Sequence, residues 1–233
     1  MEIAVLMPAY DEAGRLARTL GELAGSGVTV FLVDDGSTVP IDGASLPDGI
    51  RIVLARHPVN LGQGAALETA RRLALDPRFA PEGGFDAYVT MDSDGQHRAE
   101  DVIALARAIE AGADIALGDR FAGGSEVPAS RRALLALARL FERMTTGLRL
   151  SDAHNGLRAF GPRAIGAVRI RQNRMAHATE LTRRISRASR RGLRLVEVPV
   201  SVRYTDESLA KGQRASGAIA ILVDLFQGYL FED

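Results

Sequence analysis

Asp92 and Asp94 stand one residue apart in the stretch YVTMDSDGQH, directly after four residues that suit a buried strand. Side chains two positions apart at a strand end point to the same side, so both carboxylates lie together. A divalent cation would offset their repulsion, because Mg²⁺ and Mn²⁺ prefer carboxylate oxygens together with phosphate oxygens of a substrate. Gln96 could add a neutral ligand. The alternative is a solvated turn built from Asp and Gly.

A second acidic loop follows another apolar run, where Asp34 and Asp35 precede Gly36 and Ser37. A carboxylate there can accept a hydrogen bond from an N–H group of a nucleobase or from a ribose hydroxyl. A capped turn is the alternative interpretation.

Two glycines, Gly62 and Gly64, precede a predicted helix in the stretch HPVNLGQGAAL. Glycine lets a backbone approach a ligand closely, and a helix N-terminus favours anions. The stretch matches neither the Walker pattern nor G-x-G-x-x-G. Plain packing of the helix against a sheet is therefore the alternative.

Strands and helices alternate through the first half of the chain. Strands are predicted over residues 3–7, 28–33, 50–54, 87–91 and 115–117, and helices over 12–24, 64–75 and 99–111. This alternation indicates βαβ units and a mainly parallel sheet. Ligands of such sheets bind beyond the carboxyl ends of the strands. The loop after Met7 and both aspartate loops are therefore expected at one edge of the sheet.

The second half shows a less regular pattern. Helices are expected over residues 130–146, 178–190 and 218–230, strands over 157–160 and 193–200, and a polar loop, interpreted as a mobile lid, over 204–216. Arginine is abundant between Arg131 and Arg214, whereas Lys211 is the only lysine. This bias indicates a local anion site, or reflects only the composition of the genome.

Composition excludes several classes of protein. The formal net charge of +0 gives no argument for a nucleic-acid partner, and the absence of cysteine excludes disulfides and thiolate metal sites. No run reaches the roughly 18 apolar residues of a membrane span, and the first residues lack a signal-peptide pattern. We expect a cytoplasmic protein. Peripheral association with the inner face of a membrane, and a homodimer, stay open.

Taken together, the motifs resemble inverting family-two glycosyltransferases of the GT-A fold. VLMPAYDEAGRL, FLVDDGST, NLGQGAAL and VTMDSDGQH occur in the order and spacing of that family, and LGDRF, SDAHNGLRAF and LRLVEVPVSVRYTDESLAKGQ extend the resemblance over nearly the whole chain. The most similar group is the dolichyl- or polyprenyl-phosphate sugar synthases. The resemblance implies an α/β, Rossmann-like GT-A fold with a central, mainly parallel sheet flanked by helices. It also implies a single domain over residues 1–233, with a nucleotide-sugar half (1–120) and an acceptor half (121–233).

The resemblance assigns roles by position. The implied nucleotide-sugar site comprises Pro8, Ala9, Tyr10, Glu12, Asp35, Gly62, Gln63, Asp92, Ser93 and Arg120. A Mg²⁺ or Mn²⁺ ion would be held by Asp92, Asp94 and Gln96. Asp152 is the implied general base for a hydroxyl acceptor. Arg158, Arg203 and Lys211 would instead receive a phosphate acceptor, which needs cationic positioning more than a base.

The function expected from these residues is inverting transfer of a sugar from a nucleoside-diphosphate sugar to polyprenyl phosphate. The first alternative is transfer to a hydroxyl of a glycan, a glycolipid or a small metabolite. Two others are a sugar-nucleotide pyrophosphorylase, whose signature loop we do not find, and a nucleotide-sugar-binding regulator without catalysis. The partners expected are the sugar-nucleotide donor and a lipid-phosphate or glycan acceptor, with no nucleic acid.

Overall fold

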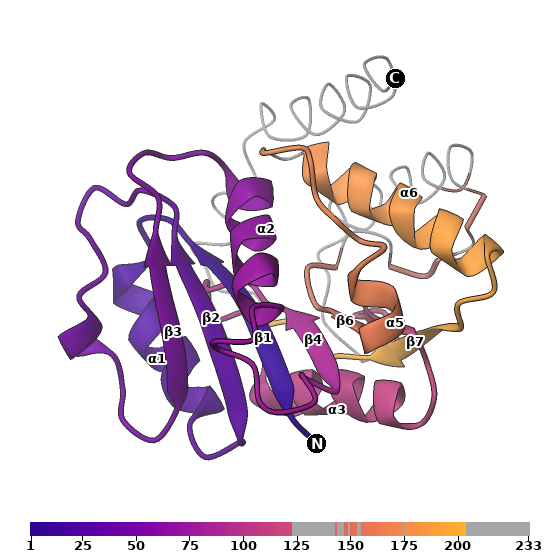
Figure 1. Ribbon diagram of the computed structural model, residues 1–233, viewed down its shortest axis with the longest axis horizontal. Coiled ribbons are helices and arrows are strands. Elements are labelled where there is room, and N and C mark those ends of the chain that lie inside the picture. The colour runs from indigo at the N-terminus through magenta and orange to yellow at the C-terminus, as the bar shows by residue number, and fades with distance from the viewer. Residues whose placement is uncertain (123–142, 144–146, 149, 153–154, 175, 204–233) are drawn as a thin grey trace.

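The structure is a computed structural model that describes residues 1–122, 143, 147–148, 150–152, 155–174 and 176–203 (Figure 1). Seven strands form one sheet in the order β3-β2-β1-β4-β6-β5-β7. They are β1 (Ile3–Ala9), β2 (Val28–Asp34), β3 (Arg51–Arg56), β4 (Ala87–Thr90), β5 (Ile115–Asp119), β6 (Arg158–Phe160) and β7 (Leu195–Pro199). The helices are α1 (Ala13–Leu23), α2 (Gln63–Ala74), α3 (Ala99–Glu110), α5 (Pro162–Ile165) and α6 (Ala176–Arg190), with a short 3-10 turn, η1 (Gly43–Ser45).

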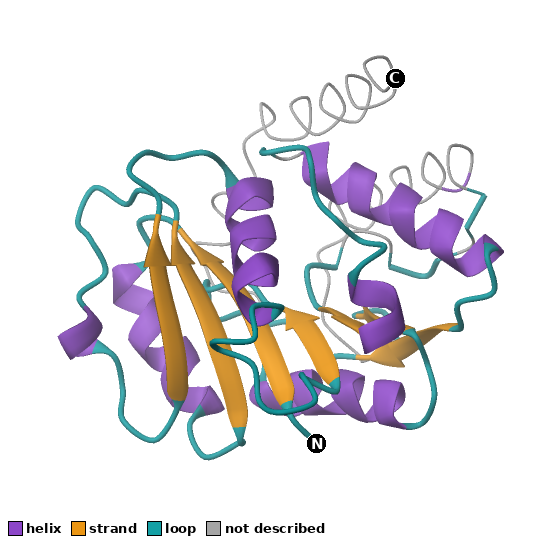
Figure 2. Cartoon of the chain, in the orientation of Figure 1, coloured by secondary structure: helices purple, strands orange, loops and turns teal. Residues whose placement is uncertain are grey.

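Helices cover both faces of the sheet, α1 and α3 on one side and α2, α5 and α6 on the other (Figures 1 and 2). Leu20 of α1 and Leu105 of α3 pack in the first layer, and Leu67 of α2 packs with Ile185 of α6 in the second. Strands buried on both faces need apolar side chains at every position, which explains the continuous apolar runs of β1 and β2. The expected α/β fold with a mainly parallel sheet is confirmed.

One strand departs from the parallel pattern. β6 lies between β4 and β5 and is antiparallel to both, with Ala159 opposite Val89 on one side and Ala116 on the other. The sheet is therefore built from both predicted halves of the chain, with β1 to β5 before residue 120 and β6 and β7 after it. This insertion brings the loop before β6 to the carboxyl end of β4, where Thr90 Oγ1 donates to the carbonyl oxygen of Gly156 at 2.7 Å.

The predicted elements of the first half agree with the observed ones, apart from their ends. Helix α6 begins earlier than predicted, and η1 and α5 are too short to leave a periodic signal. The predicted lid 204–216 and helix 218–230 lie outside the described residues, as does all of the predicted helix 130–146 except Arg143. Within the described ranges, no helix combines the length and apolar character that a membrane crossing requires.

The start of α2 is closed by protein rather than open to a ligand. The N–H groups of Gly64 and Ala65 donate to the carbonyl oxygen of Asn173, at 2.8 and 3.3 Å. A Cβ atom on Gly62 would lie 2.4 Å from that same oxygen. Of the two interpretations of this stretch, these contacts favour packing of the helix. Both glycines allow close approach of the connection between α5 and α6.

We expect Gly64→Ala to lower the free energy of unfolding by about 1–3 kcal/mol, the usual cost of overpacking. The added Cβ would lie 2.0 Å from the carbonyl oxygen of Gln172 and 2.7 Å from Cβ of His177. Gly14→Ala in α1 is the matched control, because nothing lies within 4 Å of its Cβ position. Urea unfolding of both variants measures the difference. Equal midpoints for Gly64→Ala and the unsubstituted protein would contradict the close approach.

Candidate functional site

A cavity of about 290 Å³ opens at the carboxyl ends of β1, β2 and β4. It is lined by Pro8, Ala9, Tyr10, Glu12, Asp35, Gln63, Asp92, Ser93 and Asp94. These residues include all of the predicted nucleotide-sugar site except Gly62 and Arg120. The structure thus brings together residues from four separate stretches of sequence, and their roles toward a ligand stay a prediction. We call this the donor cavity.

The loops after β1 and β2 support one another. The N–H group of Asp35 donates to the carbonyl oxygen of Ala9 at 2.8 Å, and the Asp11 carboxylate accepts from the N–H of Thr38 at 2.8 Å. Asp11 has a φ of 52°, the one non-glycine residue with positive φ in the described chain. A residue in this region is held there by its surroundings. The two loops therefore form a fixed wall of the donor cavity.

The neighbouring aspartates of the second loop have different tasks. Asp34 is buried and accepts from the N–H groups of Ser37 and Ile41 at 2.9 and 3.2 Å, with Arg56 Nε at 3.3 Å. Burial alone would raise the pKa of Asp34, but these hydrogen bonds and the Arg56 charge hold it below its usual value. Asp34 thus caps the turn, and Asp35 is left to face the cavity.

Asp35 is held by a chain of hydrogen bonds that reaches α2. Its Oδ1 lies 2.7 Å from His57 Nδ1 and accepts from the N–H of Leu61 at 3.1 Å, and its Oδ2 accepts from the N–H of Gly62 at 2.7 Å. His57 Nε2 lies 2.9 Å from Thr69 Oγ1. These contacts occupy three of the roughly four acceptor positions of a carboxylate. One position on Oδ2 is left for a donor from a ligand.

His57 is a site residue that the sequence analysis missed. It is buried, and a neutral imidazole that donates from Nδ1 and accepts at Nε2 satisfies both Asp35 and the Thr69 hydroxyl. Its only signal in the sequence is its place between an apolar strand and the glycine loop. We assign it to holding the Asp35 carboxylate in one orientation.

We expect His57→Leu to weaken binding of a nucleoside diphosphate by about tenfold, the order of one hydrogen bond to a charged group. His57→Asn is the matched control, because an Asn amide can still donate to Asp35 from the position of Nδ1. Isothermal titration gives both affinities, and circular dichroism checks the fold. An equal loss in both variants would show that the ring matters only for packing.

Asp92 and Asp94 lie together at the end of β4, with Asp92 Oδ1 accepting from Gln63 Nε2 at 2.7 Å. Burial raises the pKa of Asp92. His97 and Arg158 oppose that rise, and the like charge of Asp94 adds to it. Gly156 covers this carboxylate closely, since a Cβ there would lie 2.5 Å from Asp92 Oδ2. Burial and the neighbouring charge of Asp94 thus make ionisation of Asp92 costly without a cation.

The carboxylate oxygens of Asp92 and Asp94 suit a cation that a bound ligand would also contact. In the part of the chain that the structure describes, no three His, Asp or Glu side chains converge as a metal site. Gln96 donates its N–H to Asp94 Oδ1 at 3.1 Å, and its side-chain amide also donates to the Asp94 carboxylate, so in this orientation it supports Asp94. Two carboxylates that leave the remaining positions to water and phosphate are typical of Mg²⁺ sites.

Asp152 and Arg120 form a buried ion pair outside the lining of the donor cavity. Their side chains are 1% and 8% exposed, and Arg120 Nε lies 2.5 Å from Asp152 Oδ2. The same oxygen accepts from the N–H of Arg120 at 3.1 Å and from Asn155 Nδ2 at 3.3 Å. The predicted base and the predicted phosphate-contacting arginine therefore contact one another.

The predicted acceptor cations lie apart. Arg158 is buried on β6. Burial lowers the pKa of His177 and the Arg158 charge adds to that lowering, whereas at Asp92 the same charge opposes the rise in pKa that burial causes. Arg203 Nη1 lies 2.6 Å from Glu22 Oε1 of α1, so its side chain is engaged away from the donor cavity. Lys211 lies outside the described residues. Of the two predicted acceptor cations that the structure describes, Arg158 is the one placed beside the aspartate pair.

The family model of glycosyl transferase family 2 matches residues 4–169. An undecaprenyl-phosphate mannosyltransferase of Micrococcus luteus is 27% identical over 94% of this chain and 90% of its own length. A polyprenol monophosphomannose synthase of Mycolicibacterium smegmatis is 28% identical, over 92% of this chain and 82% of its own. Glucosyl-3-phosphoglycerate synthase from Mycobacterium tuberculosis, solved with Mn²⁺, UDP and glucosyl-3-phosphoglycerate, has a TM-score of 0.63 at 18% identity and covers 99% of this chain and 81% of that one.

Proposed function

Because this chain belongs to glycosyl transferase family 2 and is a nucleotide-sugar-dependent glycosyltransferase, we propose that it transfers a sugar, with inversion, to the phosphate of a polyprenyl phosphate. The observation that carries the proposal is the donor cavity, in which Asp35 and the Asp92–Asp94 pair line one space. Relatives named for polyprenyl-phosphate acceptors align along nearly the whole chain, which supports the same acceptor class here.

The donor would lie across this cavity. The free acceptor position of Asp35 takes an N–H group of the base, and Tyr10, which stays exposed at the cavity, lies beside it. Asp92 and Asp94 would hold Mg²⁺ or Mn²⁺, which when bound stabilises the charge that develops on the departing diphosphate. Gln63 keeps Asp92 oriented for this task.

A phosphate acceptor needs positioning rather than a base, because its oxygen is already anionic. Arg158 is the described cation placed for it, beside Asp92 on the neighbouring strand. The second candidate function is transfer to a hydroxyl, which Asp152 favours because a carboxylate can take the hydroxyl proton. A polyprenyl phosphate is a membrane lipid. With this acceptor we therefore also propose peripheral association with the inner face of a membrane.

A panel of sugar nucleotides tests the proposal. Thermal unfolding is measured with each nucleotide, with and without Mn²⁺, since a ligand that binds only the folded protein raises the midpoint. The donor that stabilises the protein is then supplied with a short polyprenyl phosphate or with free sugar acceptors. Product formed on the lipid phosphate alone supports the proposal, and product formed only on hydroxyls replaces it with the second candidate.

A further inference from the structure

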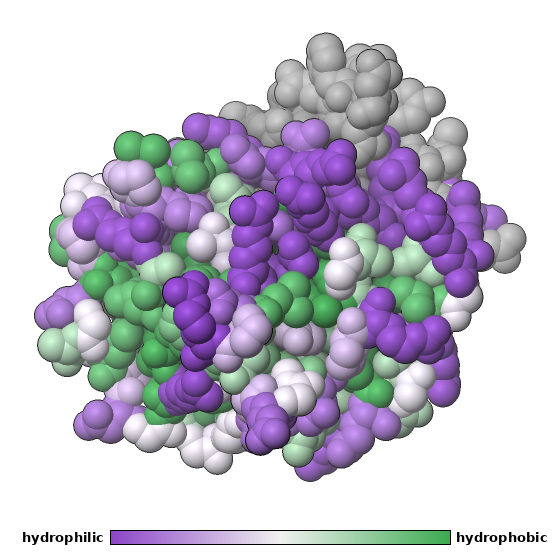
Figure 3. Space-filling view, viewed as in Figure 1, coloured by the Kyte–Doolittle hydropathy of each residue, from purple (hydrophilic) through white to green (hydrophobic). Residues whose placement is uncertain are grey.

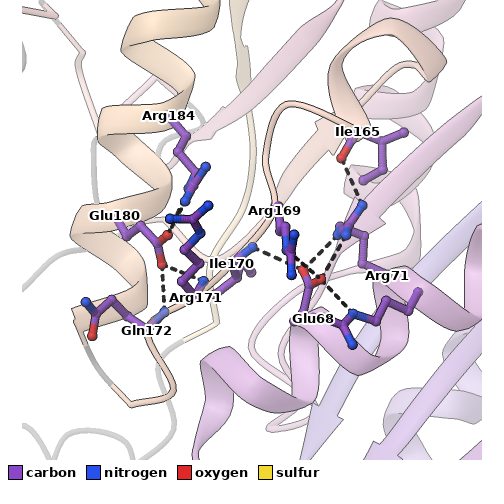
Figure 4. A network of polar contacts seen from close by, with 10 residues as sticks. Glu68, Arg71, Ile165, Arg169, Ile170, Arg171, Gln172, Glu180 and Arg184 are labelled. Atoms are coloured by element: carbon purple, nitrogen blue, oxygen red, sulfur yellow. Dashed lines mark hydrogen bonds and ion pairs between the residues drawn. The ribbon is translucent and has the colours of Figure 1, made fainter. Parts of the chain in front are cut away.

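Residues 169–173, here called the connector, run between α5 and α6 and are fixed by two buried glutamates (Figure 4). Glu68 of α2 accepts from the N–H of Ile170 at 3.0 Å. Glu180 of α6 accepts from the N–H groups of Arg171 and Gln172, both at 2.8 Å. The backbone of the connector is therefore held in place, and its side chains are presented from a fixed support.

Glu68 is saturated by its neighbours. It accepts from Arg71 Nε and Nη2, both at 2.8 Å, from Arg72 Nε at 2.9 Å and from the N–H of Ile170. Four donors fill the roughly four acceptor positions of a carboxylate. Arg169 Nε lies 4.0 Å from Glu68 Oε1, beyond hydrogen-bond distance. One negative charge thus faces three guanidinium groups, of which Arg169 makes no hydrogen bond to it.

A second cavity, of about 470 Å³, lies over this cluster. Its lining includes Thr69 and Arg72 of α2 and Arg169 and Arg171 of the connector. Arg72 and Arg169 are 62% and 55% exposed, so their remaining N–H donors are accessible. In the surface view, hydrophilic residues cover much of this side of the molecule (Figure 3). The lining shares no residue with the donor cavity.

We propose that this second cavity binds a dianionic phosphate group, held by Arg72 and Arg169. A guanidinium presents planar, paired N–H groups that match phosphate oxygens. Glu68 also lines this cavity, but Arg71 and Arg72 both donate to it, so its negative charge is offset by two guanidinium groups. Thr69 also contacts His57, which holds Asp35, so the phosphate site adjoins the support of the donor cavity. The site goes beyond the proposed transfer reaction.

Inorganic phosphate is the probe. Isothermal titration of the full chain is expected to show binding that weakens about tenfold or more in Arg72→Ala/Arg169→Ala, since hydrogen bonds to charged groups are lost. Arg18→Ala/Arg107→Ala, on α1 and α3, is the matched control with the same change in charge and is expected to bind as the unsubstituted protein does. Arg169→Gln alone guards against misfolding, because no hydrogen bond of that side chain supports the described fold. Equal binding in all variants, or equal loss in the control, overturns the site.

Two further experiments test where the phosphate binds and which kind of molecule carries it. Phosphate binding should persist with a saturating nucleoside diphosphate, and its loss there would assign the ion to the donor cavity and overturn the proposal. Flotation with phosphatidylcholine vesicles, with and without phosphatidic acid, tests a lipid headgroup. Recruitment by phosphatidic acid that needs Arg72 and Arg169 supports the site with a lipid source. Binding of free phosphate without recruitment to vesicles supports the site with a soluble source. If neither free phosphate nor the vesicles bind, the proposal is overturned. The result does not depend on sugar transfer, so it can fail separately from the proposed function.

Discussion

Asp94→Ala is expected to lower turnover by about two to three decades, the size of effect seen when one stabiliser of developing charge is removed. The residue lies on the loop after β4 and lines the donor cavity beside Asp92. With one carboxylate left, a bound Mg²⁺ or Mn²⁺ ion would lose half of its proposed protein ligands, and the diphosphate would lose its counter-charge. The fold should survive, because Asp94 bonds only Gln96 within the described residues.

Isothermal titration of a nucleoside diphosphate, with and without Mn²⁺, separates the metal from the nucleotide. The variant should bind the nucleotide with the same affinity in both conditions, whereas the unsubstituted protein should bind more tightly with Mn²⁺. Asp48→Ala, an exposed aspartate between β2 and β3, is the matched control. Metal-dependent affinity that is unchanged in Asp94→Ala would exclude the metal assignment while leaving Asp35 as a base-binding candidate.

Local sequence patterns predict the parts of this fold that depend on local physics. The apolar runs of β1 and β2 and the helical periods of α1 and α3 each lie within one short window, so their elements are predicted to within a few residues. The rule for the carboxyl ends of parallel strands then gathers Tyr10, Asp35 and Asp92 at one edge before any coordinates are known.

Contacts between distant segments are what the sequence could not supply. From the sequence alone, Gly62 and Gly64 are equally compatible with a loop that binds a ligand and with a site of close packing. The position of the Asn173 carbonyl in the structure favours packing. His57 has no pattern of its own, because its role depends on Asp35 and Thr69 on other elements. A strand over residues 157–160 is predicted, but its antiparallel insertion between β4 and β5 depends on pairing with distant strands, which a local pattern does not carry.

The ion pair between Asp152 and Arg120 is a further example, and it changes what a mutation at Asp152 can mean. From sequence, the two residues have separate tasks, one at the acceptor and one at the leaving phosphate. In the structure they are buried together, so removing one takes a charged partner away from the other. A loss of activity on its own could then come from either residue.

If the acceptor is a hydroxyl and Asp152 is its general base, Asp152→Asn is expected to lower turnover by about two to four decades, with donor affinity nearly intact. With a phosphate acceptor, which needs no base, the substitution should act only through its effect on Arg120. It should also lower the free energy of unfolding by about 3 kcal/mol, because the buried Arg120 guanidinium loses the charge of Asp152. A double-mutant cycle with Arg120→Gln separates the two effects, since contacting residues are coupled. The double variant removes both charges of the pair, so stability should return toward that of the unsubstituted protein. If Asp152 is a base, turnover of the double variant should stay below that of Arg120→Gln alone. If the double variant instead matches the turnover of Arg120→Gln, Asp152 acts only by holding Arg120, and transfer to an anionic phosphate acceptor, which needs no base, is the function that the pair supports. If donor affinity collapses together with turnover, both residues belong to the donor site.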